Sequence, residues 1–194
     1  MRTSANPEGM DAVEMAGRWR LRGSVERLVD ADAEEVYARI TDVASVGERS
    51  SECRHAAWLP SGSRWRPGMD PTPATAEQSP VVGARFRGSN RAGWARWSRV
   101  CEVVEADAGR RFAFRTVPER FDPSRADSTT WRYELVPQAT GTLVRHSYEI
   151  TRPPAPLFRA VFGRLFPHHM DMRPAMGHTL DRLAETTAPA APGS

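Results

Sequence analysis

Three side chains of the sequence could do acid–base chemistry together. His146 and Tyr148 stand two residues apart in a segment of alternating polarity, so on a β-strand both would point to the same face. Arg99 has the parity of its apolar neighbours in a second alternating segment. His146 could remove a proton in an aldol-type ring closure while Arg99 or a tyrosine hydroxyl polarises a carbonyl. The alternatives without chemistry are that His146 is a partly buried core residue and that Arg99 extends to solvent.

The same alternation predicts which other residues face a shared cavity. On each expected strand, the more apolar parity should point inward. The resulting lining is mainly aromatic, with a few polar points: Phe86, Asn90, Trp97, Arg99, Cys101, Phe112, Phe114, Trp131, Tyr133, Val144, His146 and Tyr148. Aromatic walls supply contact area and isolated polar groups fix orientation, so this set suits a flat, oxygenated, hydrophobic ligand.

Hydrophobic periodicity predicts the elements that must position these residues. We expect strands at about 19–30, 54–59, 83–91, 94–106, 110–118, 128–137 and 142–152. A capping-box pair, Asp32 and Glu35, predicts a helix over 33–42, followed by another turn or two to about 48. A long C-terminal helix should follow residue 156, with a break or kink near Pro167 and Pro174.

This order of elements predicts an α+β fold with a cavity. Strands in a run, with helices at both ends, are typical of an antiparallel sheet covered on one face. A long helix laid across the concave face of such a curled sheet leaves space between helix and sheet. We expect a single domain over 18–187, a flexible N-terminal tail over 1–17 and a disordered C-terminal tail over 188–194. The Pro-rich stretch 61–80 is expected to be an inserted loop, either a lid for the cavity or a plain surface extension.

Composition excludes several classes of function. All 27 basic residues are arginine, so lysine Schiff-base and P-loop chemistry are absent. The run 85–99 mixes arginines with aromatic residues, but alternating arginines favour a solvated strand face over nucleic-acid binding. The mean hydropathy of −0.54 and the lack of an apolar N-terminal segment predict a cytoplasmic protein. Two cysteines are too few for a disulfide framework.

Two further segments carry weaker signals. His168, His169, Asp171 and His178 superficially resemble a metal site, but Pro174 and the long spacing to His178 argue against convergence. We therefore predict no metal and no other cofactor. The amphipathic stretch 158–166 could touch anionic lipid through its arginines or pack on the sheet, and we expect no stable membrane insertion. The sequence makes no prediction about oligomeric state.

Four stretches carry a resemblance to a known family: VERLVDADAEEVYARITDVASV, VVGARFRGSNRAGWARWSRVCEVVEADAGRRFAFR, TTWRYELVPQATGTLVRHSYEI and AMGHTLDRLAE. Over residues 19–186 the chain resembles the SRPBCC superfamily, with its START-like or helix-grip fold, and specifically the polyketide cyclase/dehydrase and lipid-transport branch. The resemblance implies binding of a small polyketide- or lipid-like molecule, or alternatively a cyclase, aromatase or dehydratase. Relatives often carry a Trp-Ser-Pro-Glu-Cys-like segment where this chain reads Arg49-Ser50-Ser51-Glu52-Cys53.

Overall fold

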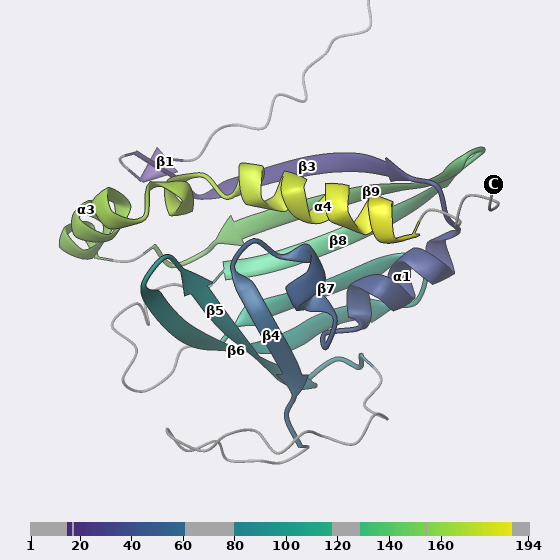
Figure 1. The fold of residues 1–194 in the computed structure, drawn as a ribbon, viewed down its shortest axis with the longest axis horizontal. Coiled ribbons are helices and arrows are strands. Elements are labelled where there is room, and N and C mark those ends of the chain that lie inside the picture. Colours follow the sequence, from purple (N-terminus) through teal and green to yellow (C-terminus); the bar gives the residue numbers. More distant parts are fainter. Residues whose placement is uncertain (1–14, 17, 61–79, 118–128, 154, 188–194) are drawn as a thin grey trace, which may run out of the picture.

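The computed structural model describes residues 15–16, 18–60, 80–117, 129–153 and 155–187 (Figure 1). Most of the predicted tails 1–17 and 188–194, and nearly all of the predicted loop 61–80, therefore lie outside the described residues. In chain order the strands are β1 (Met15–Ala16), β2 (Trp19–Arg20), β3 (Arg22–Val29), β4 (Cys53–Trp58), β5 (Arg85–Ala92), β6 (Ala95–Asp107), β7 (Arg111–Thr116), β8 (Thr129–Gln138) and β9 (Gly141–Ile150). The helices are α1 (Ala33–Thr41), α2 (Val46–Arg49), α3 (Pro156–Leu165), the 3-10 helix η1 (Pro167–Met170) and α4 (Arg173–Thr187).

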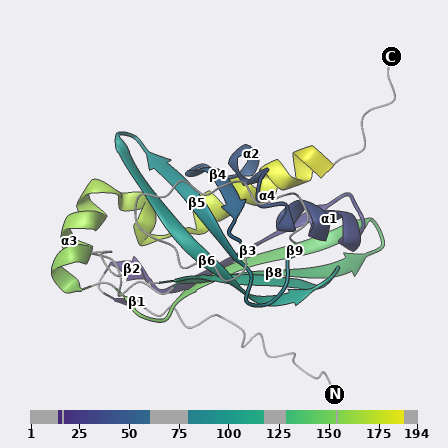
Figure 2. The same cartoon turned by 90° about the horizontal axis from the view of Figure 1, so that it is seen from below.

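Seven of the described strands form one antiparallel sheet in the order β3-β9-β8-β7-β6-β5-β4. The helices α1, α2 and α4 lie on one side of this sheet, as the view from below shows (Figure 2). The sheet curls, so that α2 contacts both β4 at one edge and α4, which itself packs on β3 at the other edge. The predicted α+β architecture, with a helix across the concave face, is confirmed.

Two predicted elements are divided in the structure, both for local reasons. The first predicted strand is split at Leu21, since β2 pairs with β1 while β3 joins the main sheet. The C-terminal helix is two separate helices, because Pro167 has no backbone N–H with which to continue α3. Residues 171 and 172 are not helical, so a second break separates η1 from α4, as the sequence predicted near Pro174. Pro174 itself occupies the first turn of α4, where a helix tolerates proline.

The main core cluster joins α1 and α4 to the sheet. Asp32 caps α1 by accepting a hydrogen bond from the backbone N–H of Glu35 at 2.8 Å, as the capping-box pattern predicted. The capped helix buries its apolar face against the sheet, and α4 adds leucines to the same cluster. The largest fully buried members are Val29, Val36, Val103, Phe112, Val144, Leu180 and Leu183.

Helix α3 lies beyond this core, at the end of the molecule that also holds β1 and β2 (Figure 1). Phe162 packs inward against Trp19 and Phe166, at ring-centroid distances of 6.2 and 4.8 Å. Val161 and Leu165 are instead more than half exposed, so packing on the sheet does not account for these two residues.

Candidate functional site

A cavity of about 300 Å³ lies between the concave face of the sheet and α4. Its walls are mostly apolar and aromatic, and its polar groups come from a few separate elements. Ten of the twelve side chains predicted to face it do so: Phe86, Asn90, Trp97, Arg99, Cys101, Phe112, Phe114, Trp131, Tyr133 and His146. The opposite wall comes from α4 and includes Ala175, Met176, Thr179 and Leu183.

Strand register explains why the parity argument found these residues. Directly opposed residues of an antiparallel pair point to the same face, so their side chains form rows across the sheet. Phe112 pairs with Tyr133, and Tyr133 pairs with His146. On the other half of the sheet, Phe86 pairs with Cys101. These rows form a continuous aromatic surface, in which the rings of Phe86 and Phe114 meet edge to face at 5.2 Å.

His146 is the least ordinary residue of this surface. It is only 4% exposed, and neither ring nitrogen has a hydrogen-bond partner in the described part of the chain. Its imidazole stacks on Tyr133, with centroids 3.9 Å apart, and lies 5.8 Å from the ring of Trp131. Buried polar groups are normally hydrogen-bonded. An unpartnered imidazole in a cavity wall is therefore a group available to hydrogen-bond a ligand.

Burial controls the charge of this histidine. It lowers the pKa of His146 to about 3, so the imidazole is neutral at physiological pH. Burial likewise raises the pKa of Tyr133 to about 12, which keeps the phenol protonated. A general base is most effective when its pKa lies near the working pH. His146 is thus better suited to donating or accepting a hydrogen bond than to removing a proton from carbon.

The depressed pKa of His146 predicts a specific pH dependence of stability. The unfolded chain protonates this histidine near its ordinary pKa of 6.5, whereas the folded chain does so only near 3. The unfolded state therefore binds the extra proton in this interval, and folding stability falls as pH falls, by up to about 1.4 kcal/mol per pH unit. We expect His146→Phe to have the shallower slope between about pH 6 and pH 4.5, measured by urea unfolding at each pH.

The matched control for this measurement is His178→Phe, since His178 is exposed on α4. It should keep the wild-type slope, because this change leaves the buried His146 in place. Equal slopes for wild type and His146→Phe would show that the buried imidazole is not held neutral.

Two predicted site residues, Val144 and Tyr148, do not line the cavity, because other side chains cover them. Val144 is fully buried in the main core cluster. Tyr148 packs with Leu21, Ile150 and Met176, and its hydroxyl donates to the backbone carbonyl of Arg20 at 3.1 Å. Both side chains have the predicted inward parity, but neighbouring elements fill the space over them. Tyr148 is thereby separated from the catalytic set predicted with His146 and Arg99.

Arg99 reaches the cavity from a different part of the sheet. It lies on β6, whereas His146 lies on β9, and strands β7 and β8 stand between them. The Arg99 guanidinium also donates a hydrogen bond to the carbonyl of Ser98 at 3.3 Å. The two groups therefore line one cavity from strands that are not neighbours.

The segment 49–53 supplies cavity residues that the parity argument missed. All five of its residues line the cavity, although they run from the end of α2 to the start of β4 rather than along one strand face. Arg49 is only 6% exposed, and its guanidinium donates to Ser45 Oγ at 2.7 Å and to the carbonyl of Asp42 at 3.4 Å. Burial lowers the pKa of Arg49, yet an arginine remains charged. In the sequence, this segment could have been singled out because it departs from the Trp-Ser-Pro-Glu-Cys-like segment of relatives.

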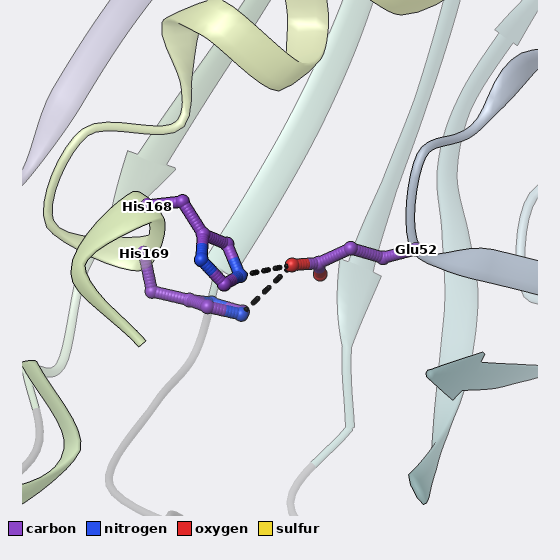
Figure 3. Close-up of side chains that lie close together, drawn as sticks. All are labelled: Glu52, His168 and His169. Atoms are coloured by element: carbon purple, nitrogen blue, oxygen red, sulfur yellow. Dashed lines mark ion pairs between the residues drawn. The ribbon is translucent and has the colours of Figure 1, made fainter. Parts of the chain in front are cut away.

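Glu52 of the same segment meets two histidines of η1, as Figure 3 shows. Its Oε1 lies 2.6 Å from Nε2 of His168 and 3.1 Å from Nε2 of His169. Burial opposes ionisation of Glu52, but the two imidazoles outweigh it and hold the pKa of the carboxyl below its ordinary value. All three residues line the cavity.

The sequence analysis considered a different set of metal ligands, namely His168, His169, Asp171 and His178. It did not include Glu52, which lies more than a hundred positions before the histidines. Asp171 turns away to pair with Arg173, at 2.6 Å, and with Arg20, at 3.5 Å. His178 is exposed on α4 and is not part of the cluster.

Comparisons with known proteins identify the family. The family described as polyketide cyclase / dehydrase and lipid transport matches residues 20–187. The chain therefore belongs to this family, which is of the SRPBCC type. None of the curated proteins matches the sequence.

Solved structures show the same fold at low sequence identity. A protein of Thermus thermophilus is 18% identical with a TM-score of 0.58, over 86% of this chain and 96% of its own. A protein of Mesorhizobium loti is 20% identical with a TM-score of 0.55, over 87% and 99%. The di-domain ARO/CYC protein StfQ of the steffimycin biosynthetic pathway is 8% identical with a TM-score of 0.60, over 86% of this chain and 50% of StfQ. The predicted helix-grip fold is confirmed.

Among the described residues, none of the helices combines the length and the apolar character needed to cross a bilayer.

Proposed function

We propose that this member of the polyketide cyclase / dehydrase and lipid transport family binds one small, hydrophobic, polyketide- or lipid-like molecule in its cavity. The observation that carries the proposal is the unpartnered, buried imidazole of His146 in an otherwise aromatic wall. Leaving such a group without a partner costs about 1–3 kcal/mol. A ligand oxygen that hydrogen-bonds to the imidazole recovers this energy, while the aromatic rings supply apolar contact.

The charges around the cavity favour a ligand that carries oxygen atoms. Arg49 brings a buried positive charge to the lining, and Asn90 adds a neutral amide. A carbonyl, phenol or carboxylate would meet hydrogen-bond donors at these points. The proposed ligand is therefore apolar over most of its surface and oxygenated at one end or along one edge.

A cyclase, aromatase or dehydratase acting in the same cavity is the second candidate. The structural likeness to StfQ, an ARO/CYC protein, favours it. The low pKa of His146, the separation of Arg99 and the burial of Tyr148 in a neighbouring cluster all weigh against it. We accordingly propose a carrier that holds its ligand without changing it.

The experiment titrates the protein with two probes, the anthraquinone emodin and the fatty acid palmitate. Quenching or enhancement of tryptophan fluorescence reports binding, since Trp97 and Trp131 line the cavity. We expect a one-to-one complex with at least one probe. His146→Phe keeps a ring of similar shape but removes both nitrogens, so the affinity for an oxygenated probe should fall about tenfold.

The matched control is His55→Phe, because His55 is exposed on β4. It should leave the affinity unchanged. Failure of both probes to form a one-to-one complex would contradict the proposal, and chemical conversion of a probe during incubation would favour the enzyme.

The proposal also covers the extent of the domain, its compartment and its partners. We propose that residues 18–187 act as one ligand-binding domain in the cytoplasm. The two free cysteines are consistent with a reducing compartment. The proposed partner is the small molecule alone, without nucleic acid.

A further inference from the structure

We propose that Glu52, His168 and His169 form a binding site for one divalent transition-metal ion of the Zn²⁺ type, at the end of the cavity that meets solvent. The site does not depend on the proposed ligand, because it is built entirely from this chain's own side chains. The three potential ligand atoms all lie within 4.8 Å of one another. Figure 3 shows both imidazoles directed at the same carboxylate oxygen.

The ligand types match a known class of metal site. Two histidines and one glutamate bind Zn²⁺ in catalytic sites that keep a further coordination position open. The same set of donors, with imidazole and carboxylate combined, also suits other first-row divalent ions. Cys53 follows Glu52 in the chain, but its Sγ donates to the carbonyl of His55 at 3.5 Å. The proposed site therefore has nitrogen and oxygen ligands only.

Small movements convert the observed arrangement into a coordination sphere. Ligand atoms about 2.0–2.2 Å from a tetrahedral ion lie about 3.3 Å from one another. Nε2 of His169 already lies 3.1 Å from Glu52 Oε1, and Nε2 of His168 lies 2.6 Å from it. An ion placed among these atoms requires Glu52 and His168 to separate by about 0.7 Å.

The buried atoms of the cluster also lack ordinary partners. Glu52 Oε1 and His169 Nε2 are both buried, and neither makes a well-aligned hydrogen bond in the described part of the chain. The two atoms are nevertheless close enough for an ion pair, at 3.1 Å. A cation placed between the atoms would give both of them a partner.

The backbone on both sides holds these side chains in place. Ser50 Oγ accepts hydrogen bonds from the backbone N–H groups of Glu52, at 3.2 Å, and Cys53, at 2.9 Å. On the other side, η1 presents His168 and His169 together, and the His169 ring packs against Trp97 and Phe162 at 5.9 and 5.1 Å. A site with supported ligands loses less conformational entropy on binding an ion.

The position of the site gives the ion a role toward the cavity. The His168 side chain is 46% exposed, whereas those of Glu52 and His169 are largely buried, so ions can enter from solvent. All three line the cavity, and an open coordination position would face it. A bound ion would then attract a ligand oxygen to the solvent end of the cavity.

The test titrates tag-free, chelator-treated full-length protein with Zn²⁺ by isothermal calorimetry. We expect one ion per chain with a Kd below about 1 µM. Glu52→Gln and His169→Gln should each weaken binding by more than the roughly 10- to 100-fold loss that follows removal of a residue that only orients a metal ligand. His168→Gln removes a ligand that is about half exposed, so this variant should remain folded and still lose Zn²⁺ affinity.

The control is His178→Gln, which changes an exposed histidine outside the cluster and should bind Zn²⁺ as the wild type does. Co²⁺ replaces Zn²⁺ in a second measurement, and its visible spectrum should show nitrogen and oxygen ligation without a thiolate charge-transfer band. Wild-type protein that binds less than one Zn²⁺ at saturation overturns the proposal. So does undiminished binding in folded His168→Gln, or a thiolate band that assigns the ion to cysteine.

Discussion

Ala175→Trp is expected to abolish ligand binding while leaving the fold intact. Ala175 lies on α4 and faces the cavity, so an indole at this position enters a space of only about 300 Å³. The affinity for whichever probe binds the wild type should fall at least about 100-fold, which equals about 2.7 kcal/mol. The new ring gains apolar contact with the aromatic wall, so the free energy of unfolding should be unchanged or higher.

The matched control places the same residue on the exposed face of the same helix. His178→Trp should retain wild-type affinity, because position 178 lies on the exposed side of α4. Fluorescence titration measures the affinity of both variants, and circular dichroism checks their folding. Unchanged probe affinity in folded Ala175→Trp would place the bound molecule outside the cavity.

Phe112→Ala is expected to produce the largest loss of stability among the cavity residues. Phe112 is 1% exposed, and its ring packs edge-on against Tyr37 of α1 and tilted against Phe114. It therefore belongs both to the cavity wall and to the main core cluster. Removing a buried phenylalanine costs about 3–5 kcal/mol. Urea unfolding should show this loss as a lower midpoint with little change in slope.

Phe114→Ala is the comparison for this prediction. Phe114 lies two residues further along β7 and faces the same cavity, but it is only partly buried. Its replacement should cost clearly less than that of Phe112, because part of the lost surface is already accessible. Equal losses of stability for the two variants would contradict the view that Phe112 is a core residue and Phe114 mainly a cavity-wall residue.

The fold and most of the cavity lining could be predicted because they depend on local patterns. Alternating polarity determines which face each strand residue occupies, and antiparallel register then aligns Phe112, Tyr133 and His146 in one row. The capping pair at Asp32 and Glu35 fixed the start of the first helix in the same way. These features need no information from distant parts of the chain.

The errors arose where distant elements meet. Parity gave Val144 and Tyr148 the correct face, but it cannot show which part of that face other elements cover. Arg49 ends α2 and Glu52 lies between α2 and β4, so strand parity applies to neither residue. Only the folded chain brings Glu52 to the histidines of η1.

The most direct test of the binding proposal is native mass spectrometry of the protein purified from its own host, followed by extraction and identification of any bound compound. We predict one unchanged aromatic or acyl molecule per chain, present in wild type and absent from Ala175→Trp. A spectrum that contains only the bare chain for both proteins, under conditions that preserve noncovalent complexes, would contradict the proposal. Recovery of a cyclised or dehydrated product would instead identify the cavity as an active site.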